Sequence, residues 1–474
     1  MTAQELEEKV WTKAKDFGIL TQDQKTKENR RGTPNAVKRS NLNFDDGKAY
    51  FGYVRPEEAP SGVYYDLSFV VLPQKDGGKC IVSIVVGSAG YQRDYDLVNT
   101  AGTRRMFLRL AENDGSSFIK NDFTDIETSA TDLLEAVSEN EELNPLQTVV
   151  DIYKKFLLAS RIVDPETEEG LNVIYAWLAQ YAKLRNWGTK AHIKSQNLAL
   201  KPYLNNKPID IQNETWRLLQ NRRFVVLQGA PGTGKTYNAL RISEHYEKTH
   251  FIQFHAETTY SDFVEGIRPK LNDANLSYEP IKGELVKAIE TAISLPRNKR
   301  VLLIIDEINR ANLSNVLGPV FFLFENQAGT RKAKLNIGGM EIDQLPSNLD
   351  VIATMNTADR SLAVVDFALR RRFAWYTIKP QEIKADEEHI FHSELFYRFC
   401  EIFDRYATDE ELNLQPGPSY FLTPKNNASE VMRDRLIFEL MPLIKEYLAE
   451  GLMRKAADSF SQIFYEETGK YLYE

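Results

Sequence analysis

One short stretch constrains the fold of this chain more than any other. An apolar run, Phe224–Leu227, leads into a glycine-rich segment with the spacing GxxxxGKT, and a helical pattern follows it. Glycines allow such a loop to curl until its backbone N–H groups and the first turn of the helix face an anion. We therefore predict a strand, loop and helix that bind nucleotide phosphates through Gly229, Ala230, Pro231, Gly232, Thr233, Gly234, Lys235, Thr236 and Tyr237.

Two carboxylates follow another apolar run further along the chain. Val301–Ile305 ends in Asp306 and Glu307. Alone, such a pair could simply end a strand, but together with the loop it predicts a hydrolytic site. We expect Lys235 to reach the β- and γ-phosphates, and Thr236 and Asp306 to hold Mg²⁺. Glu307 would act as the general base or orient the attacking water.

A third apolar run, Asp350–Thr354, leads to Asn356 within the stretch ATMNTADRS. Asn356-Thr-Ala-Asp359 nearly spells the Asn-Lys-x-Asp sequence with which GTPases read guanine. We expect Asn356 to emerge at the same sheet edge as the other two motifs, beside the γ-phosphate or the lytic water. A residue there cannot also reach the base, because the triphosphate and ribose lie between, so we interpret Asn356 as a phosphate sensor. Asp359 and Arg360 would organise this loop or meet a neighbouring subunit.

The chain is long enough for several domains, since 474 residues exceed one ordinary domain. Residues 1–145 alternate β-rich runs with turn residues and predict an α+β domain. Apolar residues at helical spacing predict a helical connector over 146–204. Short apolar strands that alternate with helices predict an α/β core with a parallel sheet over 205–380. A helical lid without strands is expected over 381–474.

Composition narrows the class of protein. The net charge of −8 excludes a uniformly basic nucleic-acid-binding protein but leaves room for local basic patches. The two cysteines, Cys80 and Cys400, lie far apart without His or Cys at ligand spacing, which argues against a zinc site and a disulfide framework. The sequence shows neither a secretory signal pattern nor an apolar run long enough to cross a membrane, so we expect a cytoplasmic protein.

Several motifs together resemble one family. With the three strands in place, the segment 224–376 resembles the AAA+ ATPase core, a P-loop NTPase fold with a helical lid. The combination of five stretches in this order is similar to the McrB family, the motor subunits of modification-dependent restriction systems, over roughly residues 205–450. The five stretches are Gln253–Pro269, Ile304–Arg310, Ala353–Ser361, Phe367–Phe373 and Gln415–Phe421.

The resemblance implies a hexameric ring with nucleotides between subunits, and a preference for GTP over ATP. It also implies a McrC-like partner that stimulates hydrolysis and supplies the nuclease. On this analogy Arg371 and Arg372 would be arginine fingers, although arginines on a helix are often simply solvated. Arg310 is a candidate for the same task, with a structural ion pair as the alternative. We expect the Gly338-Gly339 hairpin and the insert around 260–268 to face the pore or the partner.

Residues 1–200 carry no nuclease motif, so we expect this chain not to cut DNA itself. Basic residues cluster amid tyrosines in this region, and such groups can hold phosphates and stack on a flipped, modified base. Solvated charges and packed tyrosines are the plain alternative, and a protein-docking module remains open. The residues concerned are Lys25, Lys27, Arg30, Arg31, Lys38, Arg39, Arg93, Arg104, Arg105 and Arg109, with Tyr50, Tyr53, Tyr64, Tyr65 and Tyr91.

Two other functions are compatible with the same core. One is an ATP-driven protein remodeller or chaperone, which a preference for GTP or binding to methylated DNA would exclude. The other is a nucleotide-dependent scaffold with little turnover. The presence of Asp306, Glu307 and Asn356 argues against the scaffold.

Overall fold

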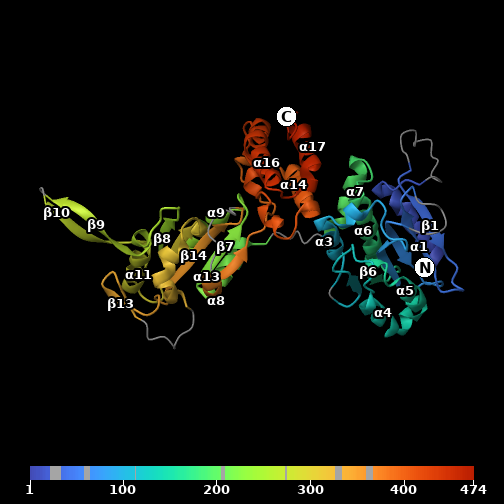
Figure 1. Ribbon diagram of the computed structural model, residues 1–474, viewed down its shortest axis with the longest axis horizontal. Coiled ribbons are helices and arrows are strands. Elements are labelled where there is room, and N and C mark those ends of the chain that lie inside the picture. The colour runs from blue at the N-terminus through green and yellow to red at the C-terminus, as the bar shows by residue number, and fades with distance from the viewer. Residues whose placement is uncertain are drawn as a thin grey trace. The chain divides into compact units, whose positions relative to one another are not determined.

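In the computed structural model the chain divides into two compact units (Figure 1). The first unit comprises Met1–Asn206 with Asp404–Thr408, and the second comprises Lys207–Phe403 with Asp409–Glu474. The described residues are 1–21, 34–57, 65–112, 114–203, 209–272, 275–325, 334–358 and 367–473. Among the helices within these stretches, none is long and apolar enough to span a bilayer.

The first unit is built on an antiparallel six-stranded sheet with the order β1-β2-β3-β4-β6-β5. Its strands are β1 (Val37–Asn41), β2 (Tyr50–Val54), β3 (Leu67–Leu72), β4 (Cys80–Val86), β5 (Ser117–Ile119) and β6 (Leu157–Val163). Its helices are α1 (Ala3–Ala14), α2 (Tyr95–Val98), α3 (Ala101–Leu108), α4 (Thr131–Ser138), α5 (Gln147–Tyr153), α6 (Glu168–Leu184) and α7 (Lys190–Leu200).

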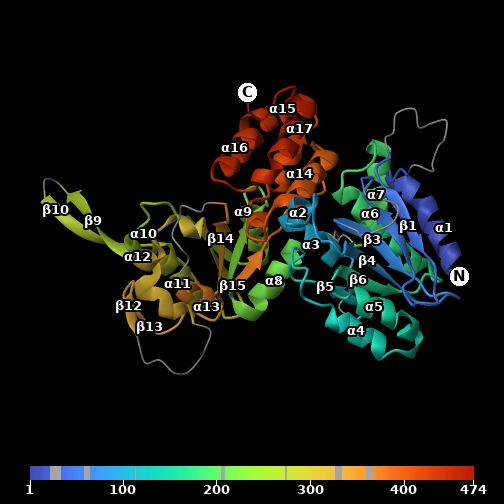
Figure 2. The ribbon, with the colours of Figure 1, turned by 45° about the vertical axis from the view of Figure 1, so that its right-hand side comes forward.

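Alternating side chains give this sheet two apolar faces. On β4, Val82 and Ile84 belong to a core with α1, α3 and α6, whereas Ile81 belongs to a separate core with α4 and α5. Figure 2 shows α4 and α5 on one side of the sheet and α6 on the other. Because successive residues of a strand point to opposite faces, one short sheet organises both cores.

The predicted helical connector over 146–204 is wrong in part. Residues Leu157–Val163 form β6, which pairs with both β4 and β5 inside the sheet. Trp177 and Tyr181 on α6 are fully buried in the main core of the first unit. A short apolar run cannot be distinguished from a helical segment by periodicity alone. This segment is therefore an integral part of the first unit.

The second unit contains a five-stranded parallel sheet with the order β15-β7-β14-β11-β8. Its strands are β7 (Phe224–Gly229), β8 (Lys248–Gln253), β11 (Val301–Asp306), β14 (Leu349–Asn356) and β15 (Ala374–Thr377). The helices of this α/β core are α8 (Ile211–Arg222), α9 (Lys235–Ile242), α10 (Tyr260–Phe263), α11 (Glu284–Ser294), α12 (Leu313–Leu317) and α13 (Phe367–Arg372).

The three inner strands, β7, β14 and β11, are buried on both faces, as parallel strands covered by helices must be, whereas the edge strand β8 is largely exposed. Leu303 and Ile305 of β11 pack in a cluster with α11 and α12, whereas Leu302 and Ile304 pack with α8 and α9. The carboxyl ends of β7, β11 and β14 consequently meet at one edge of the sheet. This edge is where the three sequence motifs emerge.

Two β-hairpins extend the core. The predicted hairpin is confirmed as β12 (Leu335–Ile337) and β13 (Met340–Ile342), joined by Gly338 and Gly339 with φ of 57° and 77°. Two positive φ angles in a two-residue turn favour glycine. A second hairpin, β9 (Glu265–Asn272) with β10 (Asn275–Lys282), extends away from the sheet and was not predicted from the sequence (Figure 1).

The C-terminal part of the second unit is mainly helical, with one correction to the prediction. A short antiparallel pair, β16 (His389–Phe391) with β17 (Leu422–Pro424), lies where no strands were expected. Strands of three residues are too short to leave a readable pattern in the sequence. The helices are α14 (Ser393–Tyr406), α15 (Ala428–Arg435), α16 (Met441–Ala449) and α17 (Ala457–Thr468).

Candidate functional site

The glycine-rich loop connects β7 to α9 as predicted. Gly232 and Gly234 have φ of 76° and 83°, a region that residues with a Cβ rarely adopt, and α9 begins at Lys235. The Lys235 ammonium donates hydrogen bonds to the carbonyls of Gly229 and Ala230 at 3.0 and 2.9 Å. The lysine is therefore held within its own loop, close to the N-terminus of α9.

The two predicted metal ligands lie in contact. The Thr236 hydroxyl, in the first turn of α9, donates to Asp306 Oδ1 at 2.7 Å. Asp306 is the last residue of β11 and is 6% exposed. Hydroxyl and carboxylate oxygens are the ligands that Mg²⁺ prefers. The donor set at this edge thus fits the expected ion.

Glu307 directly follows β11 and has an unusual backbone conformation. Its φ of 55° and ψ of 46° lie in the left-handed region, which is sparsely populated by residues other than glycine. Its carboxylate Oε2 lies 3.3 Å from the Arg310 Nε. The two alternatives for Arg310 were an arginine finger and a structural ion pair, and in the structure it forms an ion pair with Glu307.

Asn356 ends β14 beside the start of the loop. The strand register pairs it with Gly229, and its side-chain oxygen accepts the N–H of Ala358 at 3.1 Å. Its backbone carbonyl accepts a hydrogen bond from the Asn309 amide at 3.2 Å. The expected meeting of three strand ends is therefore present. Asp359 and Arg360 lie outside the described residues.

The two arginines at the end of α13 differ in their surroundings. Arg372 donates to Glu325 Oε1 at 2.6 Å, and its guanidinium lies 5.6 Å from the ring centre of Phe321. Arg371 is exposed. The sequence predicts the same role for both residues. In the structure, however, Arg372 is bound to Glu325 of the same chain, whereas Arg371 is exposed to solvent.

Several groups that touch these residues lie in stretches quoted for the family resemblance, but the sequence analysis assigned them no role. Thr354, on β14, forms hydrogen bonds with Asp306 and Glu307. After α14, Gly417 has an extended conformation and Pro418–Phe421 form a 3₁₀ turn. The N–H groups of Gly417 and Ser419 donate to the loop carbonyls of Pro231 and Gly232 at 2.9 and 3.1 Å. A Cβ at Gly417 would overlap the Gly232 backbone. The sequence Pro-Gly-Pro at 416–418 was the available signal for a tightly packed extended segment.

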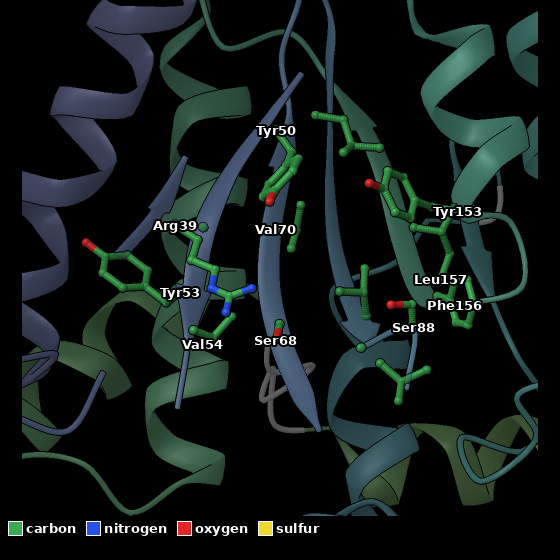
Figure 3. Close-up of a pocket in the computed structure, with 15 residues that line it drawn as sticks. Arg39, Tyr50, Tyr53, Val54, Ser68, Val70, Ser88, Tyr153, Phe156 and Leu157 are labelled. Atoms are coloured by element: carbon green, nitrogen blue, oxygen red, sulfur yellow. The ribbon is translucent and has the colours of Figure 1, made fainter. Parts of the chain in front are cut away.

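In the first unit, one cavity of about 70 Å³ lies against the sheet (Figure 3). Arg39, Tyr50 and Ser68 line it from β1, β2 and β3, and Tyr153 lines it from α5. Arg39 is only 3% exposed, so this member of the predicted basic cluster is not a solvated surface charge.

Tyr53 also borders the cavity, but its side chain points away from it (Figure 3). The Tyr53 side chain belongs to the opposite core, and the Tyr91 hydroxyl donates to the Phe123 carbonyl at 2.6 Å. Burial raises the pKa of Tyr91 above its usual value. Arg104 donates to the carbonyl of Lys120 at 2.8 Å. Lys38 lies on β1 with its ammonium 4.3 Å from the ring centre of Trp11. Four residues of the first basic run and one tyrosine lie outside the described residues: Lys25, Lys27, Arg30, Arg31 and Tyr64.

Comparison with known proteins finds relatives of the second unit. Residues 224–373 match the family described as AAA domain (dynein-related subfamily). The chain is 35% identical over 252 residues to the type IV methyl-directed restriction enzyme EcoKMcrB subunit of Escherichia coli (strain K12), covering 48% of this chain and 54% of that protein.

A second relative also belongs to a restriction system. The type II restriction enzyme BsuMI component YdiS of Bacillus subtilis (strain 168) is 27% identical over 199 residues, covering 34% of this chain and 58% of that protein. The chain thus spans little more than half the length of these two relatives.

Proposed function

We propose that this chain, which is similar to the McrB subunit and carries an AAA domain, binds and hydrolyses a nucleoside triphosphate, with GTP preferred to ATP. The observation that carries the proposal is the 2.7 Å contact between Thr236 and Asp306 beside the phosphate-binding loop. Glu307 and Asn356 lie at the same sheet edge. Catalysis of phosphoryl transfer depends mainly on positioning and electrostatic stabilisation, which a convergence of this kind can supply.

Thr236 and Asp306 would hold Mg²⁺, Thr236 directly and Asp306 through the water shell of the ion. Mg²⁺ usually retains several waters and binds substrate phosphates as well as one or two protein groups. When bound, the ion would neutralise charge on the β- and γ-phosphate oxygens. The hydrogen bond between the two side chains supports this assignment, because it brings both oxygen donors to one point.

The remaining side chains of the edge would act on the phosphate and the water. Lys235 would exchange the carbonyls of Gly229 and Ala230 for phosphate oxygens, which offer a stronger, charge-assisted hydrogen bond. Glu307 would orient the attacking water and accept its proton, once its ion pair with Arg310 is rearranged.

We assign Asn356 to sensing. Its side-chain amide would donate to the γ-phosphate or the lytic water, and its position opposite Gly229 supports this role. Asn356 therefore would not read the base, and the nucleotide preference would be set elsewhere in the site.

The active assembly would be a homo-oligomeric ring of six subunits. In this ring, Arg371 would reach into the nucleotide site of the neighbouring subunit. A guanidinium supplied in trans can stabilise the charge that develops in the transition state. The exposure of Arg371 supports its role in trans, whereas Arg372 is bound to Glu325 of its own chain. Arg372 would instead fix the end of α13.

Hydrolysis would drive the restriction of modified DNA together with a separate McrC-like nuclease subunit. Both relatives are components of restriction enzymes, and one is methyl-directed. The first unit would bind the DNA, with the cavity beside Arg39 and Tyr50 as the place for a modified base (Figure 3). A buried guanidinium next to an aromatic ring can form hydrogen bonds with a base and stack against it.

Steady-state hydrolysis of GTP and ATP by the purified chain tests this function, with and without a McrC-like protein. We expect faster turnover of GTP, stimulation by the partner, and cleavage of methylated but not unmodified DNA by the mixture. Glu307→Gln provides the inactive blank, and Glu410→Gln, at an exposed position, provides the matched control. Turnover of ATP alone, indifferent to the partner and to DNA, would contradict the restriction role.

A further inference from the structure

One hydroxyl group connects both carboxylate residues of the site. Thr354 Oγ1 donates to Asp306 Oδ1 at 2.6 Å and accepts the backbone N–H of Glu307 at 3.0 Å. Thr236 donates to the same oxygen of Asp306 at 2.7 Å. Thr354 is 1% exposed, so solvent cannot readily replace either of its contacts.

The strand register explains why this threonine lies there. The parallel pairing of β11 and β14 sets Ile305 opposite Ala353, so the next residues along the two strands, Asp306 and Thr354, are neighbours. Ile304 and Ile352, two residues earlier on each strand, pack in the cluster that contains α9. By alternation, Asp306 and Thr354 also point to the face covered by α9, the helix that carries Thr236.

The second contact of this hydroxyl bears on Glu307. The left-handed conformation of Glu307 is less favourable than a helical or extended one for a residue with a side chain. Its N–H is held by Thr354, and this hydrogen bond opposes a return of the backbone to a commoner conformation. Because the carboxylate leaves the chain at this Cα, a change of backbone conformation would redirect it.

We propose that Thr354 is a positioning residue for nucleotide hydrolysis. Its hydroxyl keeps the Asp306 carboxylate next to Thr236, where Mg²⁺ would be held, and fixes the backbone that would direct Glu307 toward the attacking water. The inference rests on the proposed hydrolytic function of this edge. It adds to that function one buried side chain that touches neither nucleotide nor water and acts through both carboxylates.

Substitutions that separate the hydroxyl from the shape of the side chain test the proposal. Thr354→Val keeps the branched shape and removes both hydrogen bonds, whereas Thr354→Ser keeps the hydroxyl. Thr215→Val is the matched control: Thr215 is a fully buried threonine of the same unit whose hydroxyl donates to the carbonyl of Ile211 within α8. All variants are assayed as full chains with GTP and ATP, after thermal unfolding has confirmed that they are folded.

We expect Thr354→Val to lower kcat roughly 10- to 100-fold, because a small misplacement of catalytic groups costs rate on that order. KM for the nucleotide should change less than about threefold, because the loop that binds the phosphates is unaltered. The Mg²⁺ concentration for half-maximal rate should rise. Thr354→Ser should restore both quantities to within about threefold of the wild type, and Thr215→Val should leave both unchanged.

Wild-type kcat and wild-type Mg²⁺ dependence in Thr354→Val would overturn the proposal. An equal loss in Thr215→Val would also overturn it, because the effect would then follow core stability. If Thr354→Val does not fold, Thr354→Ala is used, and failure of both variants to fold would assign the threonine to core stability alone.

A second readout does not require turnover. Binding of a fluorescent GTP analogue, titrated with Mg²⁺, should need more Mg²⁺ in Thr354→Val than in the wild type. A wild-type chain that binds Mg²⁺ and nucleotide but does not hydrolyse would contradict the proposed function. The titration would then still decide whether Thr354 positions Asp306, because unchanged Mg²⁺ dependence in the variant refutes that part.

Discussion

The two units use their sheets in different ways. In the second unit all strands of the main sheet are parallel, so their carboxyl ends lie together. There Asp306 accepts hydrogen bonds from Thr236 and Thr354, and Thr354 also accepts the N–H of Glu307. In the first unit the strands are antiparallel, and successive strands end at opposite edges. Some of its buried polar side chains lie within the sheet, as the hydrogen-bonded pair Ser83 and Ser160 on β4 and β6 illustrates.

This difference shows where chemistry can be expected in each unit. A parallel sheet gathers polar residues at one edge, where helix N-termini also point, and this arrangement suits phosphate binding. An antiparallel sheet with two covered faces offers a cavity between a face and its helices instead. Accordingly, substitutions at the edge of the second unit should affect hydrolysis, whereas substitutions in the cavity of the first unit should not.

The largest effect is expected at Arg371. Arg371→Ala should lower kcat about 10³-fold, as is typical for loss of an arginine finger, while nucleotide affinity is retained. Arg372→Ala should instead lower the melting temperature, because it removes the hydrogen bond to Glu325. Steady-state kinetics and thermal unfolding of both variants make the test. Normal hydrolysis by Arg371→Ala would remove this residue from the finger role.

A smaller loss is expected at Asp306. Asp306→Asn should reduce kcat about 100-fold and raise the Mg²⁺ requirement, since electrostatic stabilisation at such sites is worth that much. Removal of Mg²⁺ with EDTA should abolish hydrolysis by the wild type. Asp343→Asn, at an exposed position in the same unit, should behave as the wild type. Hydrolysis that persists in EDTA would contradict the metal assignment.

A smaller effect is expected at Gly417, where substitution by alanine should weaken nucleotide binding about tenfold. Gly417→Ala would push the extended segment away from the phosphate-binding loop, because a Cβ there overlaps the Gly232 backbone. The substitution therefore loosens the loop from the outside. Isothermal titration with GTP measures the change. Gly318→Ala serves as the control, because a Cβ at Gly318 would meet no atom within 4 Å. Gly115 also has open space, but its φ of 84° would strain an alanine.

The smallest effect on hydrolysis is expected from the first unit. Ser68→Leu should fill part of the cavity and weaken binding of methylated DNA several-fold, while basal hydrolysis stays as in the wild type. Fluorescence anisotropy with methylated and unmodified duplexes measures the binding. A loss of basal hydrolysis in this variant would show that the two units are not as separate in function as their sheets suggest.

The sequence predicted the edge of the second unit because strand ends and a loop of fixed spacing are local features. The positions of Gly229, Asp306 and Asn356 at one edge followed from motifs on three parallel strands, and the structure confirms this placement. The hairpin at Gly338 was likewise readable, since two adjacent glycines mark a tight turn.

Features that depend on pairing between distant segments were not readable. Thr354 lies within the quoted stretch Ala353–Ser361, but its contact with Asp306 depends on the register between β11 and β14, which the sequence does not give. Strand β6 was predicted as part of a helical connector because a short, mainly apolar segment such as Leu157–Val163 fits both structures, and its pairing with β4 decides for a strand. Gly417 required knowledge of which segment packs against the loop.

The most direct test of the account is an experimental structure of the chain with Mg²⁺ and a non-hydrolysable GTP analogue. We predict that Lys235 leaves the carbonyls of Gly229 and Ala230 for the phosphates, and that the ion lies beside Thr236 and Asp306. A nucleotide bound elsewhere, or Lys235 still bound to its own loop beside an occupied site, would contradict the proposal that this sheet edge hydrolyses the nucleotide.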